Sequence, residues 1–251
     1  MKFCIKYVVT AITLTLFFVG ISHSLDTSKL VGAWAFDEAS GNKVLDSSKN
    51  KLDGEIKINK GAKRVAGKFG GAIEFSGADM VVIPDAPALD LNSFTIAAWI
   101  KVPKLSGKWQ IIAAKEARNP TGRNYGIFCN INTGVIHYSF TTAGGWKSFD
   151  AKKVVTDGNW HFIAATYQKP DFKLYVDGVL DAEQKPDTVP DVNDSFLYIG
   201  GCDIGDYWMT GIIDNVTLFS VGLSEQGVKE LMGVDATTAV QPGGKVSSTW
   251  G

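Results

Sequence analysis

Cysteine and histidine are scarce in this chain of 251 residues, which contains only three of each. One cysteine and one histidine lie within the first 24 residues, and the others are Cys129, Cys202, His137 and His161. Their spacing matches no zinc motif, which excludes a zinc-finger type of fold. In an oxidising compartment Cys129 and Cys202 either form a disulfide or remain two buried thiols, and the sequence leaves both outcomes open.

Clusters of positive charge are also absent. Lys and Arg number 25 against 26 Asp and Glu, and the basic residues are scattered along the chain. Binding to phosphate backbones requires clustered positive charge, so we expect no nucleic-acid partner.

Signatures of catalysis are missing as well. The sequence has no Gly-x-Ser-x-Gly elbow, which a serine hydrolase of the α/β type would need. It also lacks the closely spaced acids along one strand that glycosidases of all-β folds use as an acid–base pair. We therefore expect a protein that is not an enzyme.

The N-terminal segment has the organisation of a secretory signal peptide. Lys2 and Lys6 give a positive start, an uncharged apolar run extends from Tyr7 to Ile21, and small residues precede a cleavage point after Ser24. The alternative is a retained membrane anchor, but the run is shorter than the roughly 20 residues that span a bilayer. We expect a signal peptide over residues 1–24, no membrane span after its removal, and a protein that is secreted, periplasmic or bound to the cell surface.

The remaining chain is rich in short apolar runs separated by glycine. There are 27 Gly and 28 aromatic side chains (14 Phe, 7 Trp, 7 Tyr), a composition typical of all-β proteins. Strict alternation in Phe94–Val102 predicts one apolar face with Phe94 and Ile96 and an opposite face with Trp99. Asp177-Gly178 between two apolar runs predicts a tight hairpin turn. We expect strands at Leu30–Phe36, Lys51–Ile58, Ala72–Phe75, Met80–Ile83, Phe94–Val102, Gln110–Lys115, Tyr125–Asn130, Val135–Phe140, Trp160–Tyr167, Phe172–Val176, Val179–Leu180, Phe196–Ile199 and Gly211–Phe219.

One helix is expected near the C-terminus. Ser224 is a suitable N-cap, Val228 and Leu231 share one face, and Gly233 can end the helix. The residues after Val234 are mainly Thr, Ser, Gly and Pro. The pattern predicts one domain over residues 25–235, built as a two-sheet sandwich, and a flexible tail over 236–251.

Four segments together resemble a known family. They are Trp34-Ala-Phe-Asp-Glu-Ala-Ser-Gly41, Phe94–Val102, Asn159–Tyr167 with Lys173–Gly178, and Gly211–Phe219. In their order and spacing they resemble the laminin-G-like jelly-roll domains of the concanavalin A-like group. The resemblance implies an all-β fold, a two-sheet antiparallel jelly-roll sandwich with one short C-terminal helix.

The same resemblance implies a calcium site that joins the start of the domain to its last strand. The matching positions are Asp37, Asp46, Asn50 and Asp214. Calcium takes six to eight oxygen ligands, and a carboxylate such as Asp214 within an apolar strand needs a cation or hydrogen-bond donors. The alternative is that these acids accept hydrogen bonds from nearby backbone amides.

Carbohydrate is the ligand class that we expect. Aromatic rings next to glycine-rich loops are suited to stacking on sugars, and a nearby arginine can bind hydroxyl groups. The candidate ligand-binding residues are Trp109, Arg123, Tyr125, Trp146, Tyr207 and Trp208. The alternative is that these rings cap the edges of the sandwich, and a packing role is also the simpler interpretation of His137.

Two other functions stay open. The exposed aromatics would also suit an extracellular protein ligand, as in a cell-surface adhesion domain. A divergent glycoside hydrolase is the second alternative. The sequence does not determine the oligomeric state, because a fold shared by lectins, adhesins and enzymes does not specify its own use.

Overall fold

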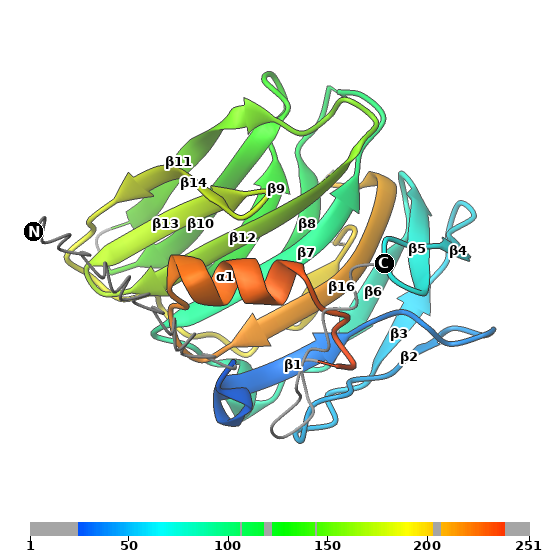
Figure 1. Cartoon of the computed structure of the whole chain (residues 1–251), viewed down its shortest axis with the longest axis horizontal. Coiled ribbons are helices and arrows are strands. Elements are labelled where there is room, and N and C mark those ends of the chain that lie inside the picture. Colours follow the sequence, from blue (N-terminus) through cyan, green and yellow to red (C-terminus); the bar gives the residue numbers. More distant parts are fainter. Residues whose placement is uncertain (1–24, 106, 118–121, 144, 203–206, 239–251) are drawn as a thin grey trace, which may run out of the picture.

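The computed structural model describes residues 25–105, 107–117, 122–143, 145–202 and 207–238 (Figure 1). The expected signal peptide over 1–24 lies outside these residues. Within the described part of the chain, none of the helices is long and apolar enough to cross a membrane.

Two antiparallel sheets of eight strands each form the described structure. In the first, sheet A, the strand order is β14-β13-β12-β7-β16-β5-β4, and β1 also pairs with β16. Its strands are β1 Leu30–Trp34, β4 Lys63–Ala66, β5 Gly71–Ser76, β7 Phe94–Lys101, β12 Trp160–Gln168, β13 Asp171–Val176, β14 Val179–Gln184 and β16 Thr210–Phe219.

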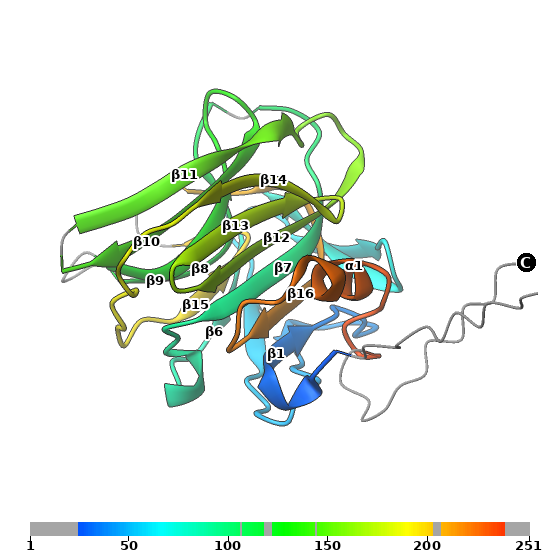
Figure 2. The same ribbon diagram turned by 60° about the vertical axis from the view of Figure 1, so that its left-hand side comes forward.

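Sheet B has the order β11-β10-β9-β8-β15-β6-β3-β2. Its strands are β2 Lys43–Val44, β3 Gly54–Lys57, β6 Met80–Ile83, β8 Gln110–Ala117, β9 Gly122–Cys129, β10 Val135–Thr142, β11 Gly145–Val154 and β15 Leu197–Ile199. The two sheets face each other, as the turned view in Figure 2 shows. The expected all-β jelly-roll sandwich is confirmed.

The two ends of the domain lie side by side. β1 pairs antiparallel with β16, with Trp34 opposite Val216, and the backbone N–H of Ser220 donates to the carbonyl of Lys29 at 2.9 Å. The start of the domain is therefore held by its last strand, as the resemblance implies.

The side chains between the sheets form the main core. On β7, Phe94, Ile96 and Ile100 point into it, whereas Ala97 and Trp99 point to the opposite side. The predicted alternation of this strand is thus confirmed, and it places β7 at the centre of sheet A with a buried surface on both sides.

Aromatic rings form a cluster within this core. The ring of Phe94 lies 5.6 Å from that of Tyr125, 5.5 Å from Tyr138 and 5.7 Å from Tyr167. Such clusters bury large apolar areas and hold sheets together.

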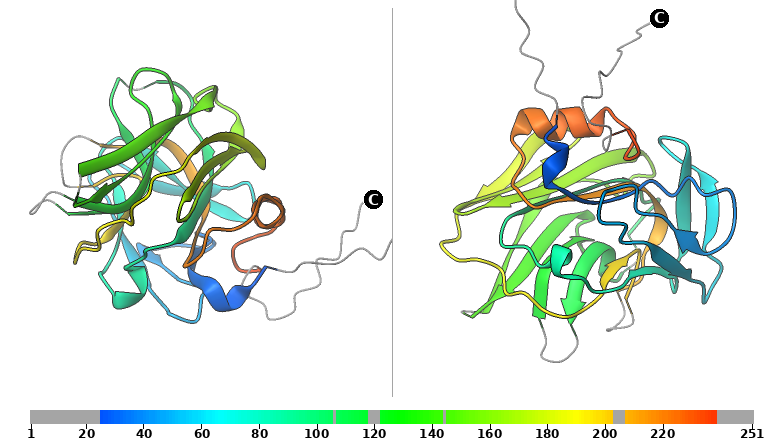
Figure 3. Two further views of the ribbon diagram at one scale, coloured as in Figure 1. Left: turned by 90° about the vertical axis from the view of Figure 1, so that its left-hand side faces the viewer. Right: turned by 90° about the horizontal axis from the view of Figure 1, so that it is seen from below.

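The outer side of sheet A is covered by the helix α1, Glu225–Met232, as the right-hand view of Figure 3 shows. The Ser224 hydroxyl accepts a hydrogen bond from the Gly227 N–H at 3.2 Å and caps the helix, which ends before Gly233. Val228 and Leu231 are buried against the sheet. This is the helix that the sequence predicts. Two 3-10 turns, Thr27–Lys29 and Pro87–Leu89, complete the described elements.

Three strands were not predicted, namely β2, β4 and β11. The first two are short, and β11 has an exposed surface on both faces with only Ala151 buried. An edge strand of this kind carries little apolar signal.

The structure also bears on the two cysteines and on the start of the tail. No disulfide joins Cys129 and Cys202, because Cys129 lies in the main core whereas Cys202 lies in a separate apolar cluster on the outer face of sheet B. Burial raises the pKa of the Cys129 thiol to about 12. The flexible tail was expected from residue 236, but Ala236 is buried and its N–H donates to Asn215 Oδ1 at 2.6 Å. Residues 239–251 lie outside the described part.

Candidate ligand-binding cavity

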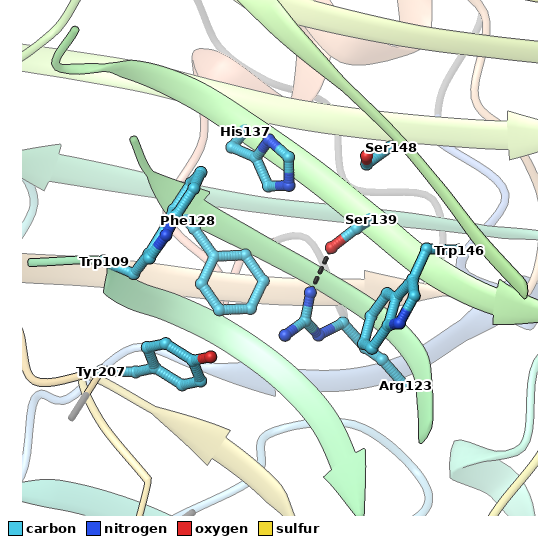
Figure 4. Close-up of a pocket in the computed structure, with 8 residues that line it drawn as sticks. All are labelled: Trp109, Arg123, Phe128, His137, Ser139, Trp146, Ser148 and Tyr207. Atoms are coloured by element: carbon cyan, nitrogen blue, oxygen red, sulfur yellow. Dashed lines mark hydrogen bonds between the residues drawn. The ribbon is translucent and has the colours of Figure 1, made fainter. Parts of the chain in front are cut away.

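An open cavity of about 220 Å³ lies on the outer face of sheet B, above strands β8 to β11 (Figure 4). It is lined by Trp109, Arg123, Phe128, His137, Ser139, Trp146, Ser148 and Tyr207. Four of these eight side chains are aromatic and the others offer hydrogen-bonding groups.

Strand alternation on β10 and β11 places part of this set. On β10, Tyr138 points into the core, so His137 and Ser139 point outward. Ser139 lies opposite Ser148 on β11, and His137 lies opposite Asp150. The two strands therefore present a row of polar side chains on one face.

A β-bulge in β9 brings the arginine to the same face. Lys115 on β8 pairs with Tyr125, but the next residue, Glu116, pairs with Arg123, so Asn124 is an extra residue in the strand. Without the bulge, Arg123 would share the inward face with Tyr125. The Asn124 side chain fixes the bulge by accepting from the Leu91 N–H and donating to the Leu91 carbonyl, both at 2.9 Å.

Arg123 is held on three sides and is only 7% exposed. Its Nε and Nη2 donate to the two carboxylate oxygens of Glu116 at 3.2 and 2.8 Å, and Nη1 donates to the Ser139 hydroxyl. The guanidinium carbon lies 4.1 Å from the ring centre of Phe128 and 4.9 Å from that of Trp146. The guanidinium group is thus sandwiched between two rings, as Figure 4 shows.

His137 occupies the opposite part of the cavity. Its Nδ1 lies 2.6 Å from Asp150 Oδ1, and its ring packs 4.6 Å from that of Trp109. Burial lowers the pKa of His137, although the hydrogen bond to Asp150 acts in the opposite direction. A neutral ring that donates through Nδ1 to Asp150 has Nε2 as a hydrogen-bond acceptor.

Apolar contacts join the remaining aromatic residues. Phe128 lies 6.4 Å from Trp109 and 6.3 Å from Tyr207 in edge-to-face contacts. Phe128 forms the floor, and Trp146, which is 51% exposed, forms a wall on the other side of Arg123. The cavity thus combines aromatic walls with an arginine, an imidazole and two serine hydroxyl groups.

Four of the six predicted ligand-binding residues meet in this cavity, namely Trp109, Arg123, Trp146 and Tyr207. Tyr125 does not, because its ring is fully buried between the sheets and its hydroxyl donates to the Leu89 carbonyl at 3.2 Å. Trp208 lies outside the lining. Its ring packs so closely against Gly201 that a Cβ atom on Gly201 would lie 2.5 Å from the ring.

Sequence reasoning missed Phe128, Ser139 and Ser148 as lining residues, and it favoured a packing role for His137. Alternation could have found His137 and Ser139, since both fall on the outward face of a predicted strand. Ser148 could not be placed without β11.

The four predicted calcium ligands form two separate groups. Asp46 Oδ1 accepts from the N–H groups of Ala33 and Ser48, and Oδ2 accepts from Leu52 N–H and the Ser48 hydroxyl, at 2.7 to 2.8 Å. The Asn50 side-chain amide donates to the Val31 carbonyl at 2.7 Å. Both side chains serve the local turn, so a four-ligand site does not fit.

Asp37 and Asp214 make up the other group. Asp214 Oδ2 accepts from the N–H groups of Lys68 and Phe69 at 2.7 and 3.0 Å, and its buried Oδ1 has no hydrogen-bond partner among the described residues. Asp37 Oδ1 accepts from the Gly71 N–H at 2.6 Å. Among the described residues, no group of three or more His, Cys, Asp or Glu side chains is placed to hold a metal ion.

Solved structures with the same fold confirm the architecture. The binding domain of Paraclostridial Mosquitocidal Protein 1 is 17% identical, with a TM-score of 0.66 over 82% of this chain and 52% of that one. Domain 4 of AbnA, a GH43 extracellular arabinanase from Geobacillus stearothermophilus, solved with arabinotriose, is 19% identical, with a TM-score of 0.66 over 81% of this chain and 98% of that one. The Trypanosoma rangeli sialidase, solved with the inhibitor DANA, is 17% identical, with a TM-score of 0.61 over 80% of this chain and 32% of that one.

The chain thus spans about half of the mosquitocidal binding domain and a third of the sialidase. A comparison with curated protein sequences gives no match. The family model described as the concanavalin A-like lectin/glucanases superfamily matches residues 75–229, which is more than half of the chain. The chain therefore belongs to the concanavalin A-like lectin/glucanases superfamily.

Proposed function

We propose that this protein is a secreted binding module that recognises carbohydrate in the cavity of sheet B. The observation that carries the proposal is Arg123, held between the rings of Phe128 and Trp146 with hydrogen-bonding groups beside it. A sugar ring has apolar C–H faces and a rim of hydroxyl groups. Aromatic walls match the first, and Arg123, His137 and Ser139 match the second.

The geometry also supports a role without catalysis. Hydrolysis of a glycosidic bond requires two carboxyl groups that face the substrate. Among the described residues, the lining contains no acid; Glu116 next to it is engaged with Arg123, and Asp150 with His137. The arabinanase domain that was solved with arabinotriose shows that this fold can hold an oligosaccharide, which supports a sugar ligand here.

A glycan array followed by isothermal titration calorimetry tests the proposal. Trp146→Ala should weaken binding of the captured glycan at least about tenfold, because it removes one wall of the cavity. Trp146 is 51% exposed, so the variant should fold as the wild type does. Phe196→Ala is the matched control, since Phe196 is also an exposed aromatic (44%) but lies outside the lining. Equal affinity of Trp146→Ala and wild type would contradict the proposal.

Cell-surface adhesion is the second candidate, because the exposed ring of Trp146 also suits a protein interface. Two results together would favour adhesion: the protein binds no glycan on the array, and it pulls down an extracellular protein. The Trp146→Ala variant should then no longer pull down that protein. Release of reducing ends from a bound polysaccharide would instead establish a hydrolase.

We also propose that calcium binds between Asp37 and Asp214 rather than at the four-residue set. The buried, unpartnered Oδ1 of Asp214 supports this location. Such an ion would supply charge compensation and tie the N-terminal segment to β16.

A further inference from the structure

The charge of the cavity bears on which sugars it can accept, on the assumption that the proposed function is correct. Of the lining residues that the structure describes, Arg123 is the one with a cationic side chain. Its charge is opposed by Glu116, whose two carboxylate oxygens accept from Nε and Nη2. This is the two-point geometry in which an arginine and a carboxylate interact most strongly.

Glu116 lies behind Arg123 and does not line the cavity. Its side chain is 5% exposed, and that of Arg123 is 8% exposed. Water screens a buried pair only weakly, so an approaching ligand meets the pair as a nearly neutral unit. The guanidinium still has N–H groups left over, because only three of its five are engaged with Glu116 and Ser139.

Asp150, which pairs with His137 at the edge of the cavity, adds negative charge there. Asp150 accepts from His137 at 2.6 Å and from the side-chain amide of Asn130 at 2.9 Å, and its own side chain is 42% exposed. Burial keeps the neutral form of His137 favoured, so it does not cancel this carboxylate. An anionic ligand would therefore be repelled by Asp150 at the edge of the cavity. It would not be compensated by Arg123, because the charge of Arg123 is already paired with Glu116.

We propose that the cavity selects uncharged sugars, and that Glu116 determines this selectivity by neutralising Arg123. Uronates, sulfated sugars and sialylated glycans are then poor ligands. Glu116 acts through Arg123 and has no contact with the ligand, so it is a residue that sets specificity from outside the site.

Paired ligands test this directly. Binding of the wild type is measured for neutral polysaccharides and their charged counterparts, such as galactan with polygalacturonate and dextran with dextran sulfate. The wild type should bind the neutral member of a recognised pair at least about tenfold more tightly. Preference for the charged member would overturn this inference while leaving carbohydrate binding intact. Absence of binding to every glycan would overturn the proposed function as well.

Glu116→Gln separates charge from packing. This variant should bind the charged members at least about tenfold more tightly than the wild type does, and this affinity should fall as the salt concentration rises. If Glu116 had a merely structural role, the variant would bind all ligands more weakly. Glu74→Gln is the control, because it removes one negative charge that is paired with Lys63 on sheet A, away from the cavity. Equal anion binding by both variants would overturn the role of Glu116. If Glu116→Gln does not fold, the wild-type comparison still decides the selectivity.

Discussion

The buried carboxyl group of Asp214 should make the stability of this protein depend on pH in an unusual direction. Asp214 is fully buried on β16, and its Oδ1 has no hydrogen-bond partner in the described part of the chain. Burial raises its pKa to about 7, and the charges of Asp37 and Asp235 act in the same direction, while the N–H groups of Lys68 and Phe69 oppose them.

The sign and the size follow from the two pKa values. The folded protein holds the proton more tightly than the unfolded chain, whose aspartate titrates near 3.8. Stability from this group is therefore fully present below about pH 4 and is lost as the pH rises through about 7. A shift of about three pH units corresponds to about 4 kcal/mol, which is an upper estimate because the structure can relax around the charge.

Urea unfolding at intervals from pH 5 to 8.5, with EDTA present, measures this effect. Asp214→Asn keeps an acceptor for the two backbone N–H groups but cannot ionise. Its free energy of unfolding should therefore rise relative to that of the wild type as the pH increases across this range. Asp37→Asn should reduce the pH dependence of the wild type, because it removes a neighbouring negative charge. Parallel curves for wild type and Asp214→Asn would refute the reasoning.

The same experiment tests calcium. If the ion binds between Asp37 and Asp214, added calcium should restore the stability of the wild type at pH 8 and leave Asp214→Asn unchanged. Identical wild-type curves with calcium and with EDTA would remove the calcium proposal.

Two further predictions concern other buried groups. Asp79→Ala should lower the free energy of unfolding by about 2 to 4 kcal/mol, because Asp79 accepts from four backbone N–H groups at 2.7 to 3.2 Å. Urea unfolding measures this, with Asp187→Ala, at an exposed side chain, as a control that should change by less than about 0.5 kcal/mol. The Cys129 thiol, with a pKa of about 12, should react with iodoacetamide at pH 8 only after unfolding. Rapid labelling of Cys129 in the native protein, detected by peptide mass spectrometry, would show that it is not buried as described.

The sequence was most informative where strands have two different faces. In β7 the alternation assigned Phe94 and Trp99 to opposite sides, and the structure places them there. The Asp177-Gly178 turn was also predicted correctly, because both residues adopt positive φ angles, 53° and 75°. These features follow from local sterics and burial, which a single sequence records directly.

The sequence was least informative about the partners of buried acids. Asp46 and Asp214 were both candidate calcium ligands through the family resemblance, and Asp214 also because a carboxylate within an apolar strand is unfavourable without a partner. In the structure, Asp46 is satisfied by the N–H groups of Ala33, Ser48 and Leu52 and by the Ser48 hydroxyl, all nearby in the chain. One oxygen of Asp214 is satisfied by two N–H groups that are distant in the chain, those of Lys68 and Phe69. Which amides meet a carboxylate depends on tertiary packing, and the residue type alone cannot distinguish them from a cation.

The cavity depends on one departure from the regular strand pattern, the bulge in β9, and strand alternation alone does not predict its two consequences. Strict alternation in β9 would turn Arg123 toward the core, and the bulge at Asn124 reverses it. The partner that neutralises Arg123, Glu116, is on the adjacent strand and is brought into register by that same bulge. A single inserted residue therefore sets both the position of the arginine and its effective charge. Selectivity at this site is consequently a property of the strand register, which an inventory of exposed aromatic residues does not reveal.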